Sequence, residues 1–596
     1  MSDTSKERSD EFLKIAGQFK LGALVTEQSH PVTANLSAVA RKDIAAALDL
    51  LFQVDEDVLN KYREFVASGR AEKIAATVTA AIKAGGKVFF TGCGSTGRLS
   101  ILLDSVWRDF WHQHKNDDYE NRTFSVMAGG DYALIKSVEG FEDFTAFGKK
   151  QIADLDVSAK DVVFAITEGG ETSFVIGTAW EGVEAGAKVY FVYNNPDEIL
   201  CEHVERSRAV IEDGRIEKIN LTTGPMAITG STRMQATSIQ LCVMLTVLEI
   251  VARDLIGTSA KDVPAQFLAA FQEGLATLRS PALREQLAKL VAMEEKVYRS
   301  GCHNNYHANR FGIDVLTDTT ERSPTFCTPP FRKFDDATAT ESWAYLFVPN
   351  DWTDSAWKNI LKRKPRCVEW DHDELMTMVS ADKLERTLET IAKISSTELM
   401  RFKVGVNGLR YRSQGVGDAA VAVISRKDDP EVHWKQLEKA ASTKSKVAQI
   451  YFGHEAAAES ARQLEERIPG SITVFVPVPE TIFLLDGVTR LMVKLAMNAL
   501  STCTMVRLGR VLGNYMVWVV PSNLKLIDRA TRYITKLTDL DYESANELLF
   551  EIIEYVEPRM KSDQAYPPVV GMAVLRAKEN VSNPEAERRL KDNPLH

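Results

Sequence analysis

From about residue 87 onward, short runs of β-branched and aromatic residues alternate with longer helix-like stretches, which constrains the fold more than any other feature. The short runs are almost continuously apolar, as is typical of strands whose two sheet faces are both covered. The first predicted strands are residues 87–90, 123–127, 161–166 and 188–193. This pattern predicts an α/β fold built on a doubly wound parallel sheet.

A second series of short runs follows the first. Its predicted strands are residues 296–299, 343–348, 419–424, 447–452 and 472–476. Residues 91–97 (Thr-Gly-Cys-Gly-Ser-Thr-Gly) align with residues 300–306, where His303 and Tyr306 replace Gly94 and Gly97. Side chains there would keep the backbone away from an anion, so we interpret the second copy as degenerate and mainly structural.

After about residue 521 the pattern becomes wholly helical and predicts a small C-terminal cap. The expected division is an N-terminal segment at 1–45 that packs on the core, a first domain at 46–260, a second at 261–520 and the cap at 521–596. The first domain carries the candidate anion site.

Composition excludes several classes of protein. The 72 Lys and Arg residues against 82 Asp and Glu give a net charge of −10, with no dense basic stripe for nucleic acid or an anionic membrane. The first 19 residues lack an apolar signal core, and no stretch approaches a membrane span, so we expect a cytoplasmic protein. The seven cysteines form no CxxC pair, which predicts free thiols.

The loop at 91–97 runs from a predicted strand into a predicted helix. Its glycines allow backbone N–H groups to converge on an anion at the positive helix end, and Ser95 and Thr96 add hydroxyl donors. The spacing fits neither the Walker loop nor the GxGxxG dinucleotide fingerprint. On these residues alone, phosphate binding and a simple tight turn are equally good explanations.

Two further glycine turns precede helices. Residues 167–173 (Thr-Glu-Gly-Gly-Glu-Thr-Ser) follow a neighbouring strand, so this loop and the first could share one ligand in the crevice at the strand ends. The third turn comprises residues 229–234 (Thr-Gly-Ser-Thr-Arg-Met). Capping of the next helix is the alternative role for Thr172 or Ser173, and the favoured one for Ser231 or Thr232. Arg233 could pair with a phosphate or with a carboxylate.

Cys302, His303 and His307 form the one cluster with metal-ligand chemistry. The i, i+4 spacing of the two histidines would place both on one helix face, but no third ligand is evident. We therefore favour a structural role, and expect neither a metal nor a cofactor.

The glycine turns occur together with other motifs in a known order. The relevant segments are Gly94-Ser95-Thr96-Gly97-Arg98-Leu99, Ala128-Gly129-Gly130-Asp131, Glu139-Gly140-Phe141-Glu142-Asp143, Gly230-Ser231-Thr232-Arg233-Met234, Thr26-Glu27-Gln28-Ser29-His30-Pro31 and Ser522-Asn523-Leu524-Lys525-Leu526. Jointly they resemble the N-acetylmuramic acid 6-phosphate etherases and the glucokinase regulatory protein family. Both belong to the sugar isomerase (SIS) superfamily, whose domains bind phosphosugars.

The resemblance implies an architecture and a set of ligand residues. It implies two SIS-type doubly wound parallel-sheet domains followed by a small helical lid, as in the regulatory protein. Ser95 and Thr96, with Gly94, match the phosphate loop, and Glu142 matches an acid that faces the sugar. The other matches are the second ligand loop at Thr167, Glu168 and Gly169, and Lys525, a lid lysine that reaches back to the ligand.

Departures from the etherase pattern bear on catalysis and affinity. The second catalytic Glu of the etherases aligns here with Val106, which can neither remove nor donate a proton. Asp104, two positions away on the helix, projects to another face and is not a simple substitute. Glu171 stands where a cation would help a phosphate, and is unfavourable there unless it points away or pairs with a base. Gln235 replaces a lysine that usually follows the third turn.

Three functional hypotheses follow. The first is a non-catalytic sensor that closes its lid over a sugar phosphate such as fructose 6-phosphate, with a sugar kinase as the partner implied by the family. The second is a phosphosugar isomerase or etherase-like lyase that acts through Glu142. The third is a scaffold with a vacant pocket, against which the retained glycines and Lys525 argue.

Overall fold

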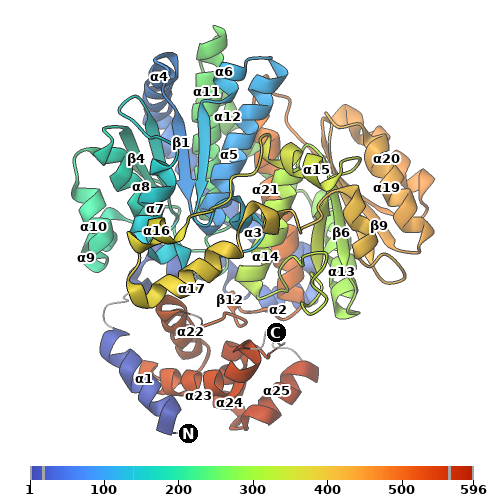
Figure 1. The fold of residues 1–596 in the computed structure, drawn as a ribbon. Coiled ribbons are helices and arrows are strands. Elements are labelled where there is room, and N and C mark those ends of the chain that lie inside the picture. Colours follow the sequence, from blue (N-terminus) through green and yellow to red (C-terminus); the bar gives the residue numbers. More distant parts are fainter. Residues whose placement is uncertain (1–2, 17–20, 139, 522, 562–565, 593–596) are drawn as a thin grey trace.

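Two parallel five-stranded sheets, each covered by helices, form the body of the molecule (Figure 1). The computed structural model describes residues 3–16, 21–138, 140–521, 523–561 and 566–592. The first sheet has the order β2-β1-β3-β4-β5. Its strands are β1 (Val88–Gly92), β2 (Thr123–Met127), β3 (Val162–Ile166), β4 (Lys188–Tyr193) and β5 (Ile216–Asn220). The four predicted strands are confirmed, and β5 was not predicted.

The second sheet repeats the topology of the first. Its strands are β6 (Asn304–Ala308), β7 (Ala344–Phe347), β8 (Ala419–Ser425), β9 (Lys446–Gly453) and β10 (Ile472–Pro477). Its order β10-β9-β8-β6-β7, taken from the other edge, matches the first sheet strand for strand, with β6 in the place of β1. The predicted doubly wound pair of α/β domains is thus confirmed.

The predicted strand at 296–299 is wrong, because these residues form the last turn of helix α13 (Pro281–Arg299). The alignment of residues 300–306 with the first loop is wrong for the same reason, since Ser300 precedes β6. The turn equivalent to the first loop lies between β6 and α14 (Gly312–Phe326). There Arg310 pairs with Asp109 and Asp486, each at 3.5 Å, and Gly312 opens α14 as Gly94 opens α5.

Three long helices lie between the sheets and join the halves. They are α3 (Ile44–Ala67), α11 (Gln235–Ile256) and α21 (Gly487–Arg507), and each contacts the other two. Nearly every residue of α11 and α21 is buried, because these helices are covered on all sides.

The long connection between β7 and β8 reaches across to the first domain. Its helices α16 (His372–Met376) and α17 (Ala381–Ala392) lie in front of the first sheet in Figure 1. Glu374 pairs with Lys150 at 2.7 Å, and the Trp370 indole donates to Asp154 at 2.8 Å. Lys150 belongs to α7 (Thr145–Ala153), so the second half of the chain braces the first domain.

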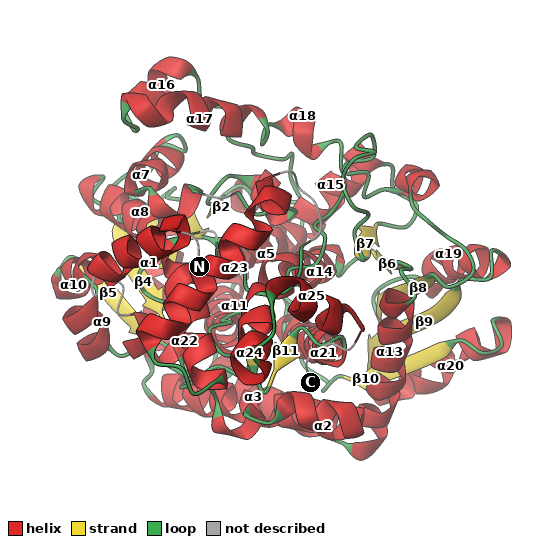
Figure 2. Ribbon diagram, turned by 90° about the horizontal axis from the view of Figure 1, so that it is seen from below, coloured by secondary structure: helices red, strands yellow, loops and turns green. Residues whose placement is uncertain are grey.

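The C-terminal part is helical, as predicted, and we call it the cap. It comprises α22 (Leu524–Leu537), α23 (Tyr542–Lys561), α24 (Val569–Glu579) and α25 (Asn583–Asp592), seen from below in Figure 2. Helix α1 (Asp3–Ala16) packs on the cap, with Ser9 Oγ donating to Asn546 Oδ1 at 2.7 Å. In the part of the chain that the structure describes, no helix has both the length and the apolarity to cross a membrane.

Candidate functional site

The first loop connects β1 to α5 (Gly94–Gln113) through Cys93. Gly94 has φ +55°, a left-handed conformation that favours glycine, and a Cβ on Gly92 would lie 2.4 Å from the carbonyl carbon of Thr96. The turn therefore needs its glycines. It places the N–H groups of Gly94 and Ser95 in the first turn of α5, where a helix has no carbonyl of its own to pair with them.

Thr96 shapes this turn. Its buried hydroxyl donates to the Cys93 carbonyl at 2.9 Å and accepts from the Cys93 N–H at 3.0 Å, which makes a reciprocal cap on α5. Ser95 is half-buried and is the other hydroxyl of the turn. It takes no part in the hydrogen bonds between Thr96 and Cys93. The two residues of the predicted hydroxyl pair thus have different environments.

Glu142 lies beside the first loop, in a short 3-10 helix at Phe141–Asp143. Its Oε2 is 3.8 Å from Cys93 Sγ, and burial raises the pKa of its carboxyl, against the opposing charge of Lys525. The neighbouring Phe141 stacks on Trp370 of the β7–β8 connection, with ring centroids 6.0 Å apart. The second half of the chain therefore helps to position this acid.

The second loop follows β3 and leads into α8 (Ser173–Glu184). Thr167 Oγ1 accepts from the Gly170 N–H at 3.3 Å and lies 3.2 Å from Thr172 Oγ1. The Gly169 carbonyl accepts from Asn195 at 3.0 Å. These hydrogen bonds fix the conformation of the second loop. It lies next to the first loop because β1 and β3 are neighbouring strands.

The capping role favoured for Ser231 or Thr232 is wrong, and the alternative role for Thr172 holds by position only. Thr172 is the N-cap residue of α8, but its side chain makes no capping hydrogen bond. Helix α11 begins at Gln235 with Met234 as its N-cap residue, so neither Ser231 nor Thr232 caps it. Thr232 instead lies near enough to Glu168 to lower the pKa of that carboxyl, which places the third turn beside the second loop.

Glu168 has an unusual proton affinity. Burial raises its pKa to about 7, and Glu321 adds to the rise, whereas hydrogen bonds from its own backbone and Thr232 and the charge of Lys525 oppose it. A carboxyl with such a pKa exchanges its proton near neutral pH, as a general acid or base must.

Lys525, in the first turn of α22, forms an ion pair with Glu171 of the second loop. The other oxygen of Glu171 pairs with Arg206 at 2.6 Å. Burial alone would raise the pKa of Glu171, but Lys525 and Arg206 lower it to about 2. The acid that replaces an etherase cation is thus paired with two bases, of which Arg206 carried no sequence signal.

Further contacts dock α22 on the first domain. Glu27 pairs with Arg529 at 3.0 Å and with Arg532 at 2.9 Å, and the Tyr533 hydroxyl donates to the Thr229 carbonyl. A Cβ on Gly230 would lie 2.6 Å from that hydroxyl, so the third turn needs glycine for this approach. Of the quoted motifs, Glu139 and Ser522 lie outside the described residues.

Several other predicted positions lie away from the two loops. Arg233 pairs with a carboxylate, Asp318 of the second half, at 3.4 Å and donates to Ser501 at 2.9 Å. Gln235 bonds the backbone of Pro225 and Ala227. Val106 is only 3% exposed in the core.

Asp104 is a structural acid. Its carboxylate pairs with Arg108 at 2.8 Å, Arg363 at 3.0 Å and Arg366 at 2.9 Å. Although burial opposes ionisation, these arginines hold the pKa of Asp104 well below its usual range. It therefore does not replace the missing Glu at Val106.

His303 and His307 lie before and on β6, so the expected shared helix face is absent. Burial lowers the pKa of His307 to about 3. Within the described ranges, no group of three or more His, Cys, Asp or Glu side chains could hold a metal ion. All seven cysteines are free thiols, as predicted.

Comparison with known proteins identifies the family. A model of the glucokinase regulatory protein N-terminal SIS domain matches residues 70–180. The N-acetylmuramic acid 6-phosphate etherase of Serratia proteamaculans (strain 568) is 30% identical over 225 residues, covering 38% of this chain and 68% of the etherase. The etherase of Yersinia pestis (strain Pestoides F) is 31% identical over 226 residues, covering 38% and 69%.

A solved structure, the C-terminal domain of glucosamine-fructose-6-phosphate aminotransferase from Francisella tularensis, aligns with 78% of this chain and 97% of its own, at a TM-score of 0.43 and 11% identity. The sequence relatives carry the assignment. The chain belongs to the SIS-domain family of the N-acetylmuramic acid 6-phosphate etherases, and its first domain is similar to that of the glucokinase regulatory protein.

Proposed function

We propose that this protein binds a phosphorylated sugar between its first domain and α22, and acts as a non-catalytic sensor of that sugar. The observation that carries the proposal is the Lys525–Glu171 ion pair, because it joins the cap to the second loop beside the first. The relatives that match the first domain are named for N-acetylmuramic acid 6-phosphate, a phosphosugar.

The charges support a dianionic ligand at this place. The first turn of α5 offers backbone N–H groups and the hydroxyl of Ser95 at the positive end of a long helix. Burial disfavours the charge of Lys525, but Glu171 and Glu142 raise its pKa, so the ammonium stays charged beside the loops. A phosphate at the loop would gain a charge-assisted hydrogen bond from this lysine.

The residue at position 106 argues against etherase chemistry. Elimination of an ether needs one group that removes a proton and another that protonates the leaving oxygen. Val106 occupies the position of one of these groups and is packed in the core. Of the two acids that the etherases use, this chain keeps only the one at Glu142, which can contact a sugar without completing the elimination.

A sensor also needs two states that the ligand distinguishes. A ligand shifts the equilibrium only if it binds the closed state better than the open one. Lys525 is held by Glu171 in this closed arrangement, and a phosphate would provide a second anion that favours it. On the family resemblance, we propose a sugar kinase as the partner that senses the position of the cap. Co-purification of a kinase with and without fructose 6-phosphate tests this partner.

Titration calorimetry tests whether the protein binds a phosphosugar. We expect saturable heat with at least one of fructose 6-phosphate, fructose 1-phosphate and N-acetylmuramic acid 6-phosphate. Lys525→Met and Ser95→Ala should each weaken binding by about tenfold or more, since each removes a hydrogen bond to a charged group. Lys536→Met, an exposed lysine at the far end of α22, is the matched control. Absence of heat with all three sugars would contradict the proposal.

A phosphosugar isomerase is the second candidate, and the pKa of Glu168 at about 7 favours it. Isomerisation through an enediol needs one well-placed base, and Glu142 and Glu168 are two buried carboxyls near Lys525. Incubation with glucose 6-phosphate and fructose 6-phosphate in D₂O distinguishes the candidates. Deuterium incorporation that Glu142→Gln or Glu168→Gln abolishes would establish the isomerase, and no incorporation would exclude it for these substrates.

A further inference from the structure

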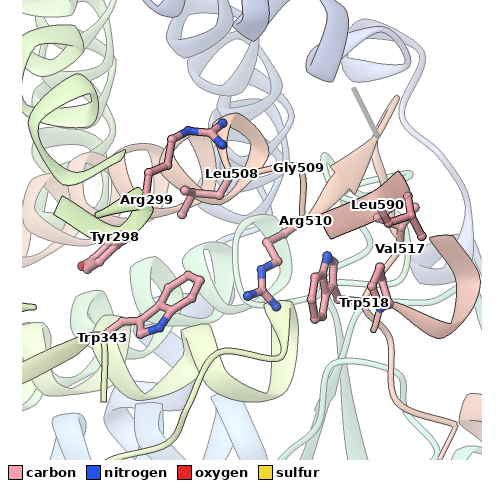
Figure 3. A pocket seen from close by; sticks show the side chains of 10 residues that line it. Tyr298, Arg299, Trp343, Leu508, Gly509, Arg510, Val517, Trp518 and Leu590 are labelled. Atoms are coloured by element: carbon pink, nitrogen blue, oxygen red, sulfur yellow. The ribbon is translucent and has the colours of Figure 1, made fainter. Parts of the chain in front are cut away.

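A cavity of about 380 Å³ lies away from the two loops, where the second half of the chain meets the cap (Figure 3). Tyr298 and Trp343 line it from the second domain, and Arg510 and Trp518 from the segment around the hairpin β11 (Val511–Leu512) and β12 (Tyr515–Met516). Pro568 and Leu590 line it from the cap. Its volume falls within the range of small-molecule sites.

Arg510 is the distinctive residue of this cavity. Its guanidinium carbon lies 3.6 Å from the ring centroid of Trp518 and 4.8 Å from that of Trp343, between the two indoles in Figure 3. One nitrogen donates to the carbonyls of Phe326 at 3.2 Å and Cys327 at 3.1 Å, which fixes the group in place.

Among the residues that the structure describes, no carboxylate neutralises the charge of Arg510. Arg510 is 7% exposed, and within the described ranges no carboxylate pairs with it and no group accepts from its Nε or its other terminal nitrogen. Burial lowers its pKa to about 10. A buried cation without a counter-ion is costly unless an anion joins it. Arg299, which also lines the cavity, is instead neutralised by Glu295 at 2.9 Å.

We propose that this cavity binds a small organic anion, with a carboxylate or phosphate group on a flat apolar body. The free donors of Arg510 face the anionic group, because hydrogen bonds between charged partners are the strong ones. Tyr298, Trp343 and Trp518 supply aromatic surface for the apolar body. A bound anion contacts the second domain, the hairpin and the cap together, and so stabilises the docked cap.

Calorimetry on the full-length protein with 2-naphthoate, 2-naphthyl phosphate and neutral 2-naphthamide tests the site. We expect one saturable site for at least one anion, with affinity at least about tenfold above that of the amide, since the amide cannot pair with a cation. The two anions distinguish a carboxylate ligand from a phosphate ligand. Quenching of tryptophan fluorescence that is reduced in Trp518→Phe locates binding to this cavity.

Two variants separate the site from general stability. Arg510→Met should remove the preference for the anion, whereas Arg299→Met, whose charge is already neutralised, should change the affinity less than about threefold. A cooperative urea-unfolding transition serves as the check that Arg510→Met is folded. The proposal fails if neither anion binds saturably to the wild-type protein, if the amide binds equally well, or if a folded Arg510→Met binds unchanged. Should Arg510→Met not fold, the wild-type comparison of anions with the amide decides alone.

Discussion

At the residue scale, Glu171 controls how much of the positive charge of Lys525 is available to a ligand. The two form an ion pair, so a phosphate has to share the lysine with this carboxylate. We expect Glu171→Gln to bind fructose 6-phosphate about three- to tenfold more tightly, because the competing anion is gone while Arg206 stays in place. Titration calorimetry measures the change. Glu184→Gln, an exposed acid at the C-terminal end of α8, should leave the affinity unaltered, and weaker binding by Glu171→Gln contradicts this competition.

The raised pKa of Glu168 predicts that the stability of the protein depends on pH. Its pKa is about 7 in the folded protein, chiefly because of burial, against 4.5 when unfolded, so the folded state holds a proton that the unfolded state releases between these values. This contribution to stability is present below pH 4.5 and is lost as the pH rises to about 7. At pH 8 we expect Glu168→Gln to unfold with a free energy higher than wild type by on the order of 2 kcal/mol.

Urea unfolding at pH 5 and pH 8 measures this effect. The gain of Glu168→Gln over the wild-type protein should be smaller at pH 5, where Glu168 is still protonated in the folded state. Glu72→Gln, an exposed acid on α4 (Arg70–Lys83), is the control for general charge effects. An equal gain at both pH values would rule out Glu168 as the titrating group.

At the element scale, one buried amide side chain joins two helices of the cap to helix α1. Asn546 of α23 accepts from Ser9 of α1 at 2.7 Å and donates to Thr531 of α22 at 2.9 Å. Asn546→Ala leaves both partners buried and should loosen the cap by about 1–3 kcal/mol. Hydrogen exchange in α22 should rise and phosphosugar affinity should fall, because α22 carries Lys525. Glu543→Gln, exposed on the same helix, should do neither, and unchanged exchange in Asn546→Ala refutes the linkage.

Strands were predictable from the sequence where their buried residues are apolar. The strand β3 reads Val-Val-Phe-Ala-Ile, and it was found. The strand β6 reads Asn-Asn-Tyr-His-Ala and was missed, because three of its five buried residues are polar and give no apolar run. Asn304 donates to Glu294 at 2.5 Å, and Asn305 donates to the Ser413 carbonyl at 3.1 Å. No local sequence pattern indicates such hydrogen-bond partners.

The candidate site shows the same limit. Glu142, Glu168 and Lys525 came from motifs, and the structure brings them together, while their role in binding stays a prediction. Charge alone also implied that Glu171 would either point away from a phosphate or pair with a base. It did not identify the base, since Arg206 lies on α10 (Glu205–Glu212), and only the folded chain brings it within 2.6 Å.

At the scale of the whole molecule, the two halves are joined through buried charge. Arg363 of the β7–β8 connection pairs with Asp104 at 3.0 Å and with Asp131 at 2.5 Å, both in the first domain. Asp131 also accepts from the backbone N–H of Arg366 at 2.6 Å. The connection is therefore held by two acids of the first domain, one on α5 and one just after β2. This is the domain with the proposed phosphosugar site.

Removing this arginine should uncouple the halves. Arg363→Met leaves Asp131 with a buried charge, which costs about 3–5 kcal/mol when a buried pair is broken. We expect calorimetric unfolding to separate into two transitions, with fructose 6-phosphate raising the midpoint of only the transition of the first domain, since a ligand stabilises the unit that binds it. Lys364→Met, exposed and adjacent, should unfold as the wild-type protein does. If Arg363→Met unfolds in one transition at the wild-type temperature, the pairs of Arg363 do not hold the halves together, and the packing of the shared helices α3, α11 and α21 carries that task.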